Sequence, residues 1–80
     1  MNYIYILELN ENKICIAQCN KYIENICEFF NSINDDWINR YKISNILELI
    51  QTNKYDELTS ISKQYIEKIG IENVKIIYNI

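Results

Sequence analysis

The chain has 80 residues, of which 49% are hydrophobic and 24% are charged, and its net charge is −3. This length fits one domain over residues 1–80, and the hydrophobic content excludes an intrinsically disordered chain. The excess of acidic over basic residues argues against an electropositive surface, so we expect binding to nucleic acid to be weak or absent.

The first two predicted elements form a hairpin. Residues 3–9 are mostly β-branched and aromatic, which is typical of a buried strand. An Asn-rich turn follows, because Asn tolerates positive φ and hydrogen-bonds its own backbone. Residues 13–18 then alternate loosely between apolar and polar side chains. The two segments are therefore expected to pair antiparallel.

A helix is predicted next, over about residues 21–32. Asn20 is a candidate N-cap, since its side-chain oxygen can accept a hydrogen bond from the first turn. The helical spacing rests on one apolar stripe, formed by Ile23, Ile26, Cys27 and Phe30. A short helical turn is expected near residues 36–41.

The segment at residues 45–51 allows two interpretations. Its apolar residues fit helical spacing, with Ser44 or Asn45 as a possible cap. The same run, Ile46 to Ile50, is equally compatible with a short central strand. Periodicity alone does not decide between a buried helix and a buried strand of this length.

The C-terminal part contains a helix and an extended segment. Apolar residues at helical spacing predict a helix over about 56–69, and Gly70, the only glycine, follows where a helix end favours positive φ. Residues 73–79 form an extended segment that we expect to lie at a sheet edge. The fold class is therefore α+β, with a small antiparallel three-stranded sheet (about 3–9, 13–18 and 45–51) and helices.

The composition limits the chemistry and the compartment. With no His, the chain lacks the commonest general base and metal ligand. Three cysteines are an odd number, which argues against a closed disulfide framework and favours a reducing, intracellular compartment. No apolar run is long enough for a membrane span, and no signal-peptide pattern opens the sequence. We therefore expect no membrane association.

The cysteines and the paired carboxylates are the remaining candidates. Cys15, Cys19 and Cys27 match no common zinc spacing. Small buried hydrophobic side chains, for Cys15 and Cys27, are the favoured interpretation over a metal or redox site. The acidic pairs Asp35-Asp36 and Asp56-Glu57 stand at expected helix starts, where they complement the helix dipole. The residues alone thus predict a small α+β domain without an evident active site.

Several segments in order resemble a GIY-YIG endonuclease domain, in particular the short forms of large DNA viruses with AT-rich genomes. More than half of the chain is Ile, Asn, Lys or Tyr, which fits such a genome. The resemblance implies that residues 45–51 are the third strand, and, if the chain is viral, a location in the host cytoplasm or the virion. The matching segments are Tyr3-Ile4-Tyr5-Ile6-Leu7, Asn12-Lys13-Ile14-Cys15-Ile16-Ala17-Gln18-Cys19, Ile26, Trp37 with Tyr41-Lys42, Ile46-Leu47-Glu48-Leu49-Ile50, Tyr65-Ile66, and Gly70-Ile71-Glu72-Asn73-Val74.

The family's catalytic positions are only partly kept. Tyr5 matches the tyrosine of the first namesake motif, and Glu57 falls near the glutamate that holds the metal. Cys15 replaces the second tyrosine, and Asn25 replaces the helix arginine. The resemblance thus implies that these positions are vestigial and that the protein is not catalytic. Loss of a single oxyanion donor costs about 2.7–4 kcal/mol of transition-state stabilisation, and Asn25 cannot supply the positive charge of the arginine that it replaces. We expect no cofactor and no bound metal.

The functional hypothesis is a catalytically inactive nuclease-fold module that binds a protein partner. Its expected binding patch, in the former cleft, consists of Tyr5, Cys15, Phe29 and Phe30, and self-association through the C-terminal edge strand is a further possibility. The alternative is a divergent endonuclease that uses Tyr5, Tyr3 and Glu57 with Mg²⁺ or Mn²⁺, and with Lys21 or Arg40 in place of the arginine. Non-catalytic nucleic-acid binding and a cysteine metal site are weaker alternatives.

Overall fold

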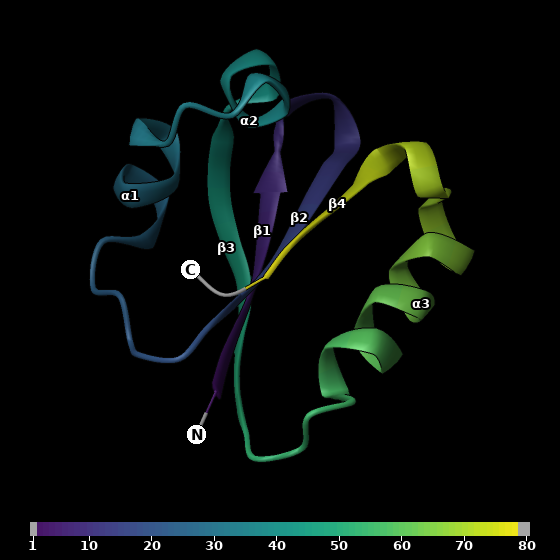
Figure 1. The fold of residues 1–80 in the computed structure, drawn as a ribbon. Coiled ribbons are helices and arrows are strands. Elements are labelled where there is room, and N and C mark those ends of the chain that lie inside the picture. The colour runs from purple at the N-terminus through teal and green to yellow at the C-terminus, as the bar shows by residue number, and fades with distance from the viewer. Residues whose placement is uncertain (1, 79–80) are drawn as a thin grey trace.

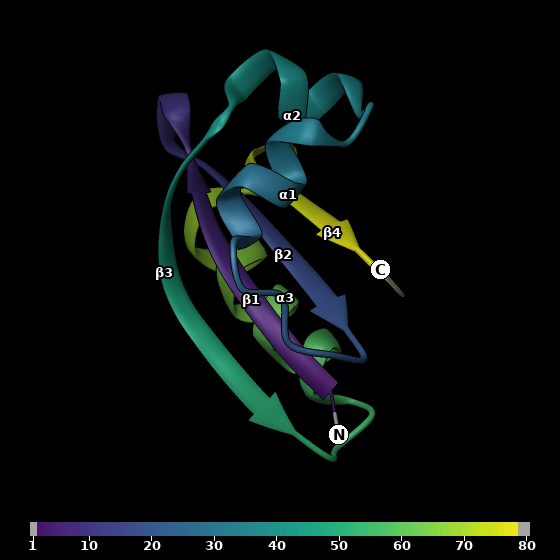
Figure 2. The same cartoon turned by 90° about the vertical axis from the view of Figure 1, so that its left-hand side faces the viewer.

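The computed structural model describes residues 2–78, which form one mixed sheet with helices on both faces (Figure 1). The four strands are ordered β3-β1-β2-β4. Two helices, α1 and α2, lie against one face of the sheet, and α3 lies against the other, as the turned view in Figure 2 shows. The prediction of a small α+β domain is confirmed.

The predicted hairpin is present. Strand β1 (Asn2–Leu9) pairs antiparallel with β2 (Lys13–Cys19), with Tyr5 opposite Ala17. The connection is a 3-10 turn at Asn10–Asn12, in which Glu11 and Asn12 take positive φ values of 62° and 61°. Asn12 thus takes the conformation that Asn tolerates, and Glu11 takes the same conformation although its residue type does not favour it.

The ambiguous segment is a strand. Strand β3 (Ile43–Thr52) pairs antiparallel with β1 along its whole length, so its backbone hydrogen bonds come from β1 and not from a helical turn. The helical interpretation is wrong for this reason, and so is the central position, since β3 lies at the edge of the sheet. Two register shifts interrupt the ladder in the first half of β3, and from Glu48 to Thr52 the pairing is regular.

The first helix is shorter than predicted. Helix α1 covers Ile26–Ser32 instead of residues 21–32, and Asn20 is therefore not its N-cap. The backbone N–H and C=O of Ile23 are both hydrogen-bonded to the Tyr5 hydroxyl, so this part of the connection is held in another conformation. The predicted helical turn is confirmed as α2 (Asp36–Tyr41), which the side chain of Asp35 caps through the N–H of Ile38 at 3.0 Å.

The last helix and strand extend the sheet. Helix α3 (Glu57–Ile69) matches the predicted helix and ends at Gly70, whose φ is +93°. After a 3-10 turn (Ile71–Asn73), strand β4 (Val74–Ile77) pairs parallel with β2. The extended segment predicted for 73–79 is thus an edge strand over four residues, and its last residue lies outside the described part. The predicted sheet had three antiparallel strands, whereas the observed sheet has four and is mixed. The fourth strand joins because α3 carries the chain to the far side of β2.

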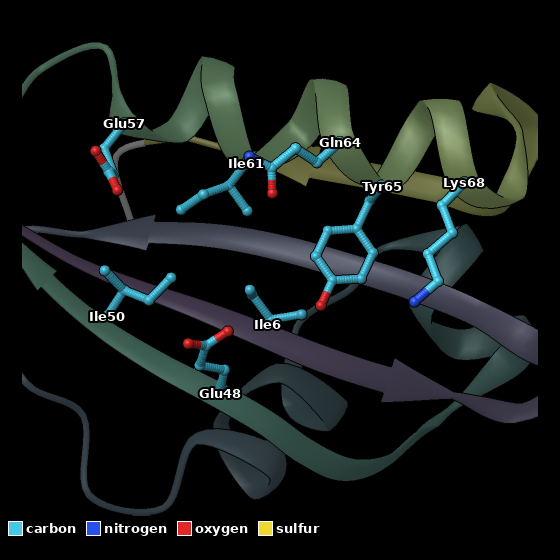
Figure 3. Close-up of a pocket in the computed structure, with 8 residues that line it drawn as sticks. All are labelled: Ile6, Glu48, Ile50, Glu57, Ile61, Gln64, Tyr65 and Lys68. Atoms are coloured by element: carbon cyan, nitrogen blue, oxygen red, sulfur yellow. The ribbon is translucent and has the colours of Figure 1, made fainter.

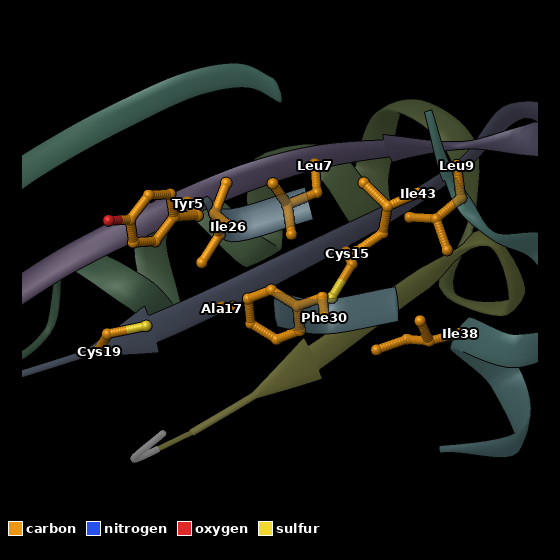
Figure 4. Close-up of a cluster of buried hydrophobic side chains, with 10 residues drawn as sticks. All are labelled: Tyr5, Leu7, Leu9, Cys15, Ala17, Cys19, Ile26, Phe30, Ile38 and Ile43. Carbon is orange, nitrogen blue, oxygen red and sulfur yellow. The ribbon is translucent and has the colours of Figure 1, made fainter. Parts of the chain in front are cut away.

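Alternation along the strands divides the core into two layers. Tyr5, Leu7 and Leu9 of β1 pack with α1 and α2, whereas Ile4 and Ile6 pack with Leu58 and Ile61 of α3. Figure 4 shows the layer beneath α1 and α2. Two buried layers around one sheet let so short a chain bury many large side chains.

Candidate functional site

Tyr5 is a structural residue of the core. Its side chain is 2% exposed, and its hydroxyl accepts a hydrogen bond from the Ile23 N–H at 2.9 Å and donates to the Ile23 carbonyl at 3.3 Å. Burial raises the pKa of its phenol above the usual value. A neutral hydroxyl that is occupied as donor and acceptor is not free to position an attacking water.

Cys15 lies in the same layer and is fully buried, with Phe30 beside it in Figure 4. Burial, with a smaller contribution from the negative charge of Asp35, raises the pKa of the Cys15 thiol to about 12. The thiolate is the reactive form of cysteine, and it is absent here near neutral pH. Burial likewise raises the pKa values of Cys19, which is fully buried, and Cys27, which is half-buried.

The expected binding patch does not form. Tyr5, Cys15 and Phe30 are core residues, and only Phe29, with 37% exposure, reaches the surface. The prediction failed because alternation places Tyr5 and Cys15 on the face that α1 covers, with Phe30 as the inner residue of that helix. The predicted recognition surface is therefore wrong: three of its four residues are buried in the core, and Phe29 alone is accessible.

The four positions that the resemblance aligns with catalytic residues do not share a cavity. Asn25 lies just before α1 and lines a shallow pocket with Phe29 on the face that α1 covers. Glu57 begins α3 and lines a pocket with Ile6 on the opposite face. Tyr5 and Glu57 are thus separated by the sheet, so the site of the endonuclease alternative, which uses both, is not assembled.

Other residues of the endonuclease alternative are placed elsewhere. The ring of Tyr3 packs edge-on against the ring of Tyr22, with 6.1 Å between the ring centroids. Arg40 of α2 lies over the ring of Tyr41. Among residues 2–78, no group of three or more Cys, Asp or Glu side chains is arranged to hold a metal ion. No helix in this range is long and apolar enough to cross a membrane.

The strongest candidate site is a groove between α3 and β3. One pocket of about 390 Å³ has an apolar base and polar sides (Figure 3). A second pocket of about 230 Å³ shares Tyr65 and Lys68 with it and continues along α3 toward Leu47 and Ile69. The first pocket is lined by Ile6, Glu48, Ile50, Glu57, Ile61, Gln64, Tyr65 and Lys68.

The strand that borders this groove has an unpaired edge. Within the described residues, β3 pairs with β1 alone, so the N–H and C=O groups that point away from β1 are open to another strand. The strand also exposes Ile46, Leu47 and Leu49 by 41, 45 and 38%. An exposed apolar edge strand beside a groove is suited to bind an extended segment of another chain.

Little in the sequence predicts this groove. Its residues come from three separated segments, and only Glu57 was a candidate, for a different role. The signal that existed was the run Ile46 to Ile50, in which Glu48 interrupts an apolar sequence. Periodicity does not tell whether such a strand lies at the centre or at the edge of a sheet.

Comparison of the chain with protein-family models, with curated proteins and with solved structures found no match.

Proposed function

We propose that this protein is a catalytically inactive module, similar in fold to GIY-YIG nuclease domains, that binds an extended segment of a partner protein. The segment adds to the free edge of β3 and directs side chains into the groove beside α3. The observation that carries the proposal is a ten-residue edge strand that borders this groove, with Leu47 exposed beside the groove and Ile46 and Leu49 exposed on the opposite face.

The order of the elements supports the resemblance. An antiparallel hairpin is followed by helix α1, the third strand then pairs with β1, and helix α3 comes after it. The segments that carry the sequence resemblance lie on these elements. The parallel strand β4 is an addition that the resemblance did not imply.

The placement of the vestigial residues supports the absence of catalysis. The phenol of Tyr5 is buried and hydrogen-bonded, and the thiol of Cys15 is buried and neutral. Asn25 carries no charge to meet a phosphate. Each lost donor or base costs roughly a hundredfold to ten-thousandfold in rate. Glu57, the carboxylate that the resemblance implies as the metal ligand, lies on the other face of the sheet.

The form of the edge supports a short extended ligand. The register shifts lie in the first half of β3, where they distort the edge and hinder long strand-to-strand pairing. The regular half, Glu48 to Thr52, is the half that borders the larger pocket through Glu48 and Ile50. Main-chain hydrogen bonds to this half would give affinity, and the pocket would select side chains.

The proposal is tested by selecting binders from a random linear-peptide display library. The best peptide is then titrated into isotope-labelled protein and followed by amide chemical shifts. We expect shifts in Glu48–Thr52 and in the residues of α3 that line the groove, and little change around Asn25. A selection without binders, or shifts that map to the α1 face, would contradict the proposal.

The absence of catalysis is tested by a nicking assay on supercoiled plasmid with added Mg²⁺ or Mn²⁺. We expect no cutting above the level of a Glu57→Ala control. Metal-dependent cutting that this substitution abolishes would show that the module is a nuclease.

A further inference from the structure

We infer that the bound segment places a cationic side chain, Arg or Lys, in the groove between Glu48 and Glu57. This inference rests on the proposed function and specifies which partner the groove accepts. It follows from the lining of the larger pocket, which combines an apolar base with two carboxylates on its sides (Figure 3).

The base of the groove suits the stem of such a side chain. Ile6 and Ile61 are 1% and 7% exposed, and Ile50 beside them is half-buried. Arg and Lys carry three or four methylene groups that pack on apolar surface while the charged end stays near water. A purely apolar side chain would fill the base and leave the carboxylates without a partner.

The two carboxylates enter the groove from opposite sides. Figure 3 shows Glu48 reaching in from β3 and Glu57 from the start of α3. The ion pair found within residues 2–78 joins Lys75 to Asp35 at 3.8 Å, in the layer that α1 and α2 cover, and involves neither glutamate. Two unpaired carboxylates from opposite sides favour a positive charge between them.

Lys68 gives the groove a direction. It lies at the other end of the pocket, eleven residues along α3 from Glu57, which corresponds to about 16 Å of helix. That distance is spanned by about five residues of extended chain. A cation is therefore favoured between Glu48 and Glu57, and one placed near Lys68 would be repelled.

The residues of the β3 edge disfavour pairing with a second copy of this chain and favour a different partner protein. A two-fold pairing of β3 with itself centred on Glu48 would bring two equal charges opposite each other. Pairing centred further back would run through the shifted register of both strands. Sedimentation of the free protein should therefore show a monomer, and a stable dimer through β3 would overturn the inference.

The test uses the display-selected peptide and its variants. The basic residue of the peptide is replaced by citrulline, which keeps the shape of Arg but removes the charge. Each peptide is titrated by calorimetry into the unaltered protein and into Glu48→Gln, Glu57→Gln and the double variant. Glu67→Gln is the matched control, because Glu67 is an exposed residue of α3 that does not line the groove.

We expect enrichment of Arg or Lys at one position of the selected peptides. Each single Gln variant should weaken binding of the basic peptide about two- to threefold and the double variant about fivefold, as for partly exposed charge pairs. The citrulline peptide should bind all variants alike, and the double-mutant cycle isolates the charge contribution. Lys68→Gln should leave the affinity for the basic peptide unchanged or raise it.

The outcomes separate this inference from the function on which it rests. Peptides that map to β3 but show no basic preference, with Glu48→Gln and Glu57→Gln without effect, would overturn the inference and leave the binding function standing. Selected peptides that bind away from β3, or no selected peptides, would contradict both. Equal losses in Glu67→Gln would show that net charge, and not the groove, attracts the peptide.

Discussion

At the scale of single residues, the Tyr5 hydroxyl stabilises the fold. It holds the connection before α1 by bonding both backbone groups of Ile23. Tyr5→Phe would leave the Ile23 N–H without this partner, and we expect a loss of about 1–2 kcal/mol in the free energy of unfolding. Urea denaturation measures it, with Tyr55→Phe as control because Tyr55 is 92% exposed. Equal stability of the two variants would contradict this role.

The thiol of Cys15 makes stability depend on pH. Its pKa is about 12 in the folded protein and near 9 when exposed, so the folded state holds the proton more tightly. The stabilisation is complete below pH 9 and is lost as the pH rises toward 12, by up to about 1.4 kcal/mol per pH unit.

This prediction is checked by urea denaturation in reductant at pH 8, 9 and 10. In Cys15→Ala, the free energy of unfolding should fall less steeply above pH 9, whatever the effect of the substitution on stability at pH 8. Cys27→Ala should flatten this decline less, since Cys27 is only half-buried. A decline that is unchanged in Cys15→Ala would show that this thiol is not responsible.

At the scale of elements, Gly70 fixes the turn between α3 and β4. Its φ of +93° and ψ of 147° form a conformation that residues with a Cβ avoid. A Cβ at this position would also come within 2.8 Å of the Glu72 carboxylate, whose flexible side chain can move. We expect Gly70→Ala to cost about 1–3 kcal/mol, measured by thermal or urea unfolding.

A double variant separates the two causes. If the backbone conformation dominates, Gly70→Ala should lower the free energy of unfolding by the same amount in the Glu72→Ala variant as in the unaltered protein. Recovery of stability in the double variant would instead assign the cost to the side-chain contact.

The sequence predicted elements where one local signal was sufficient. The hairpin, α2, α3 and the end at Gly70 follow from alternation, an acidic cap and helical spacing. The start of α1 was missed because a long-range bond, from Tyr5 to Ile23, competes with the helix. The identity of β3 was ambiguous because its partner, β1, decides it.

At the scale of the whole molecule, the site depended on information that no local pattern contains. Alternation on β1 and β2 placed Tyr5 and Cys15 on one face, but which helix covers that face is set by the path of the chain. The same path carries Glu57 to the other face, next to Glu48 and Ile50. The sequence therefore identified one residue of the groove, Glu57, whereas the groove that it lines with Glu48 and Ile50 emerged only from the topology.

The most direct test of binding at the β3 edge is a backbone N-methyl scan of the selected peptide. Each N-methyl group removes one N–H donor from the peptide without altering the protein. Strand addition predicts an alternating pattern, in which every second substitution abolishes binding and those between have little effect. Equal tolerance at all positions, or losses that follow a helical spacing of three to four residues, would contradict the account.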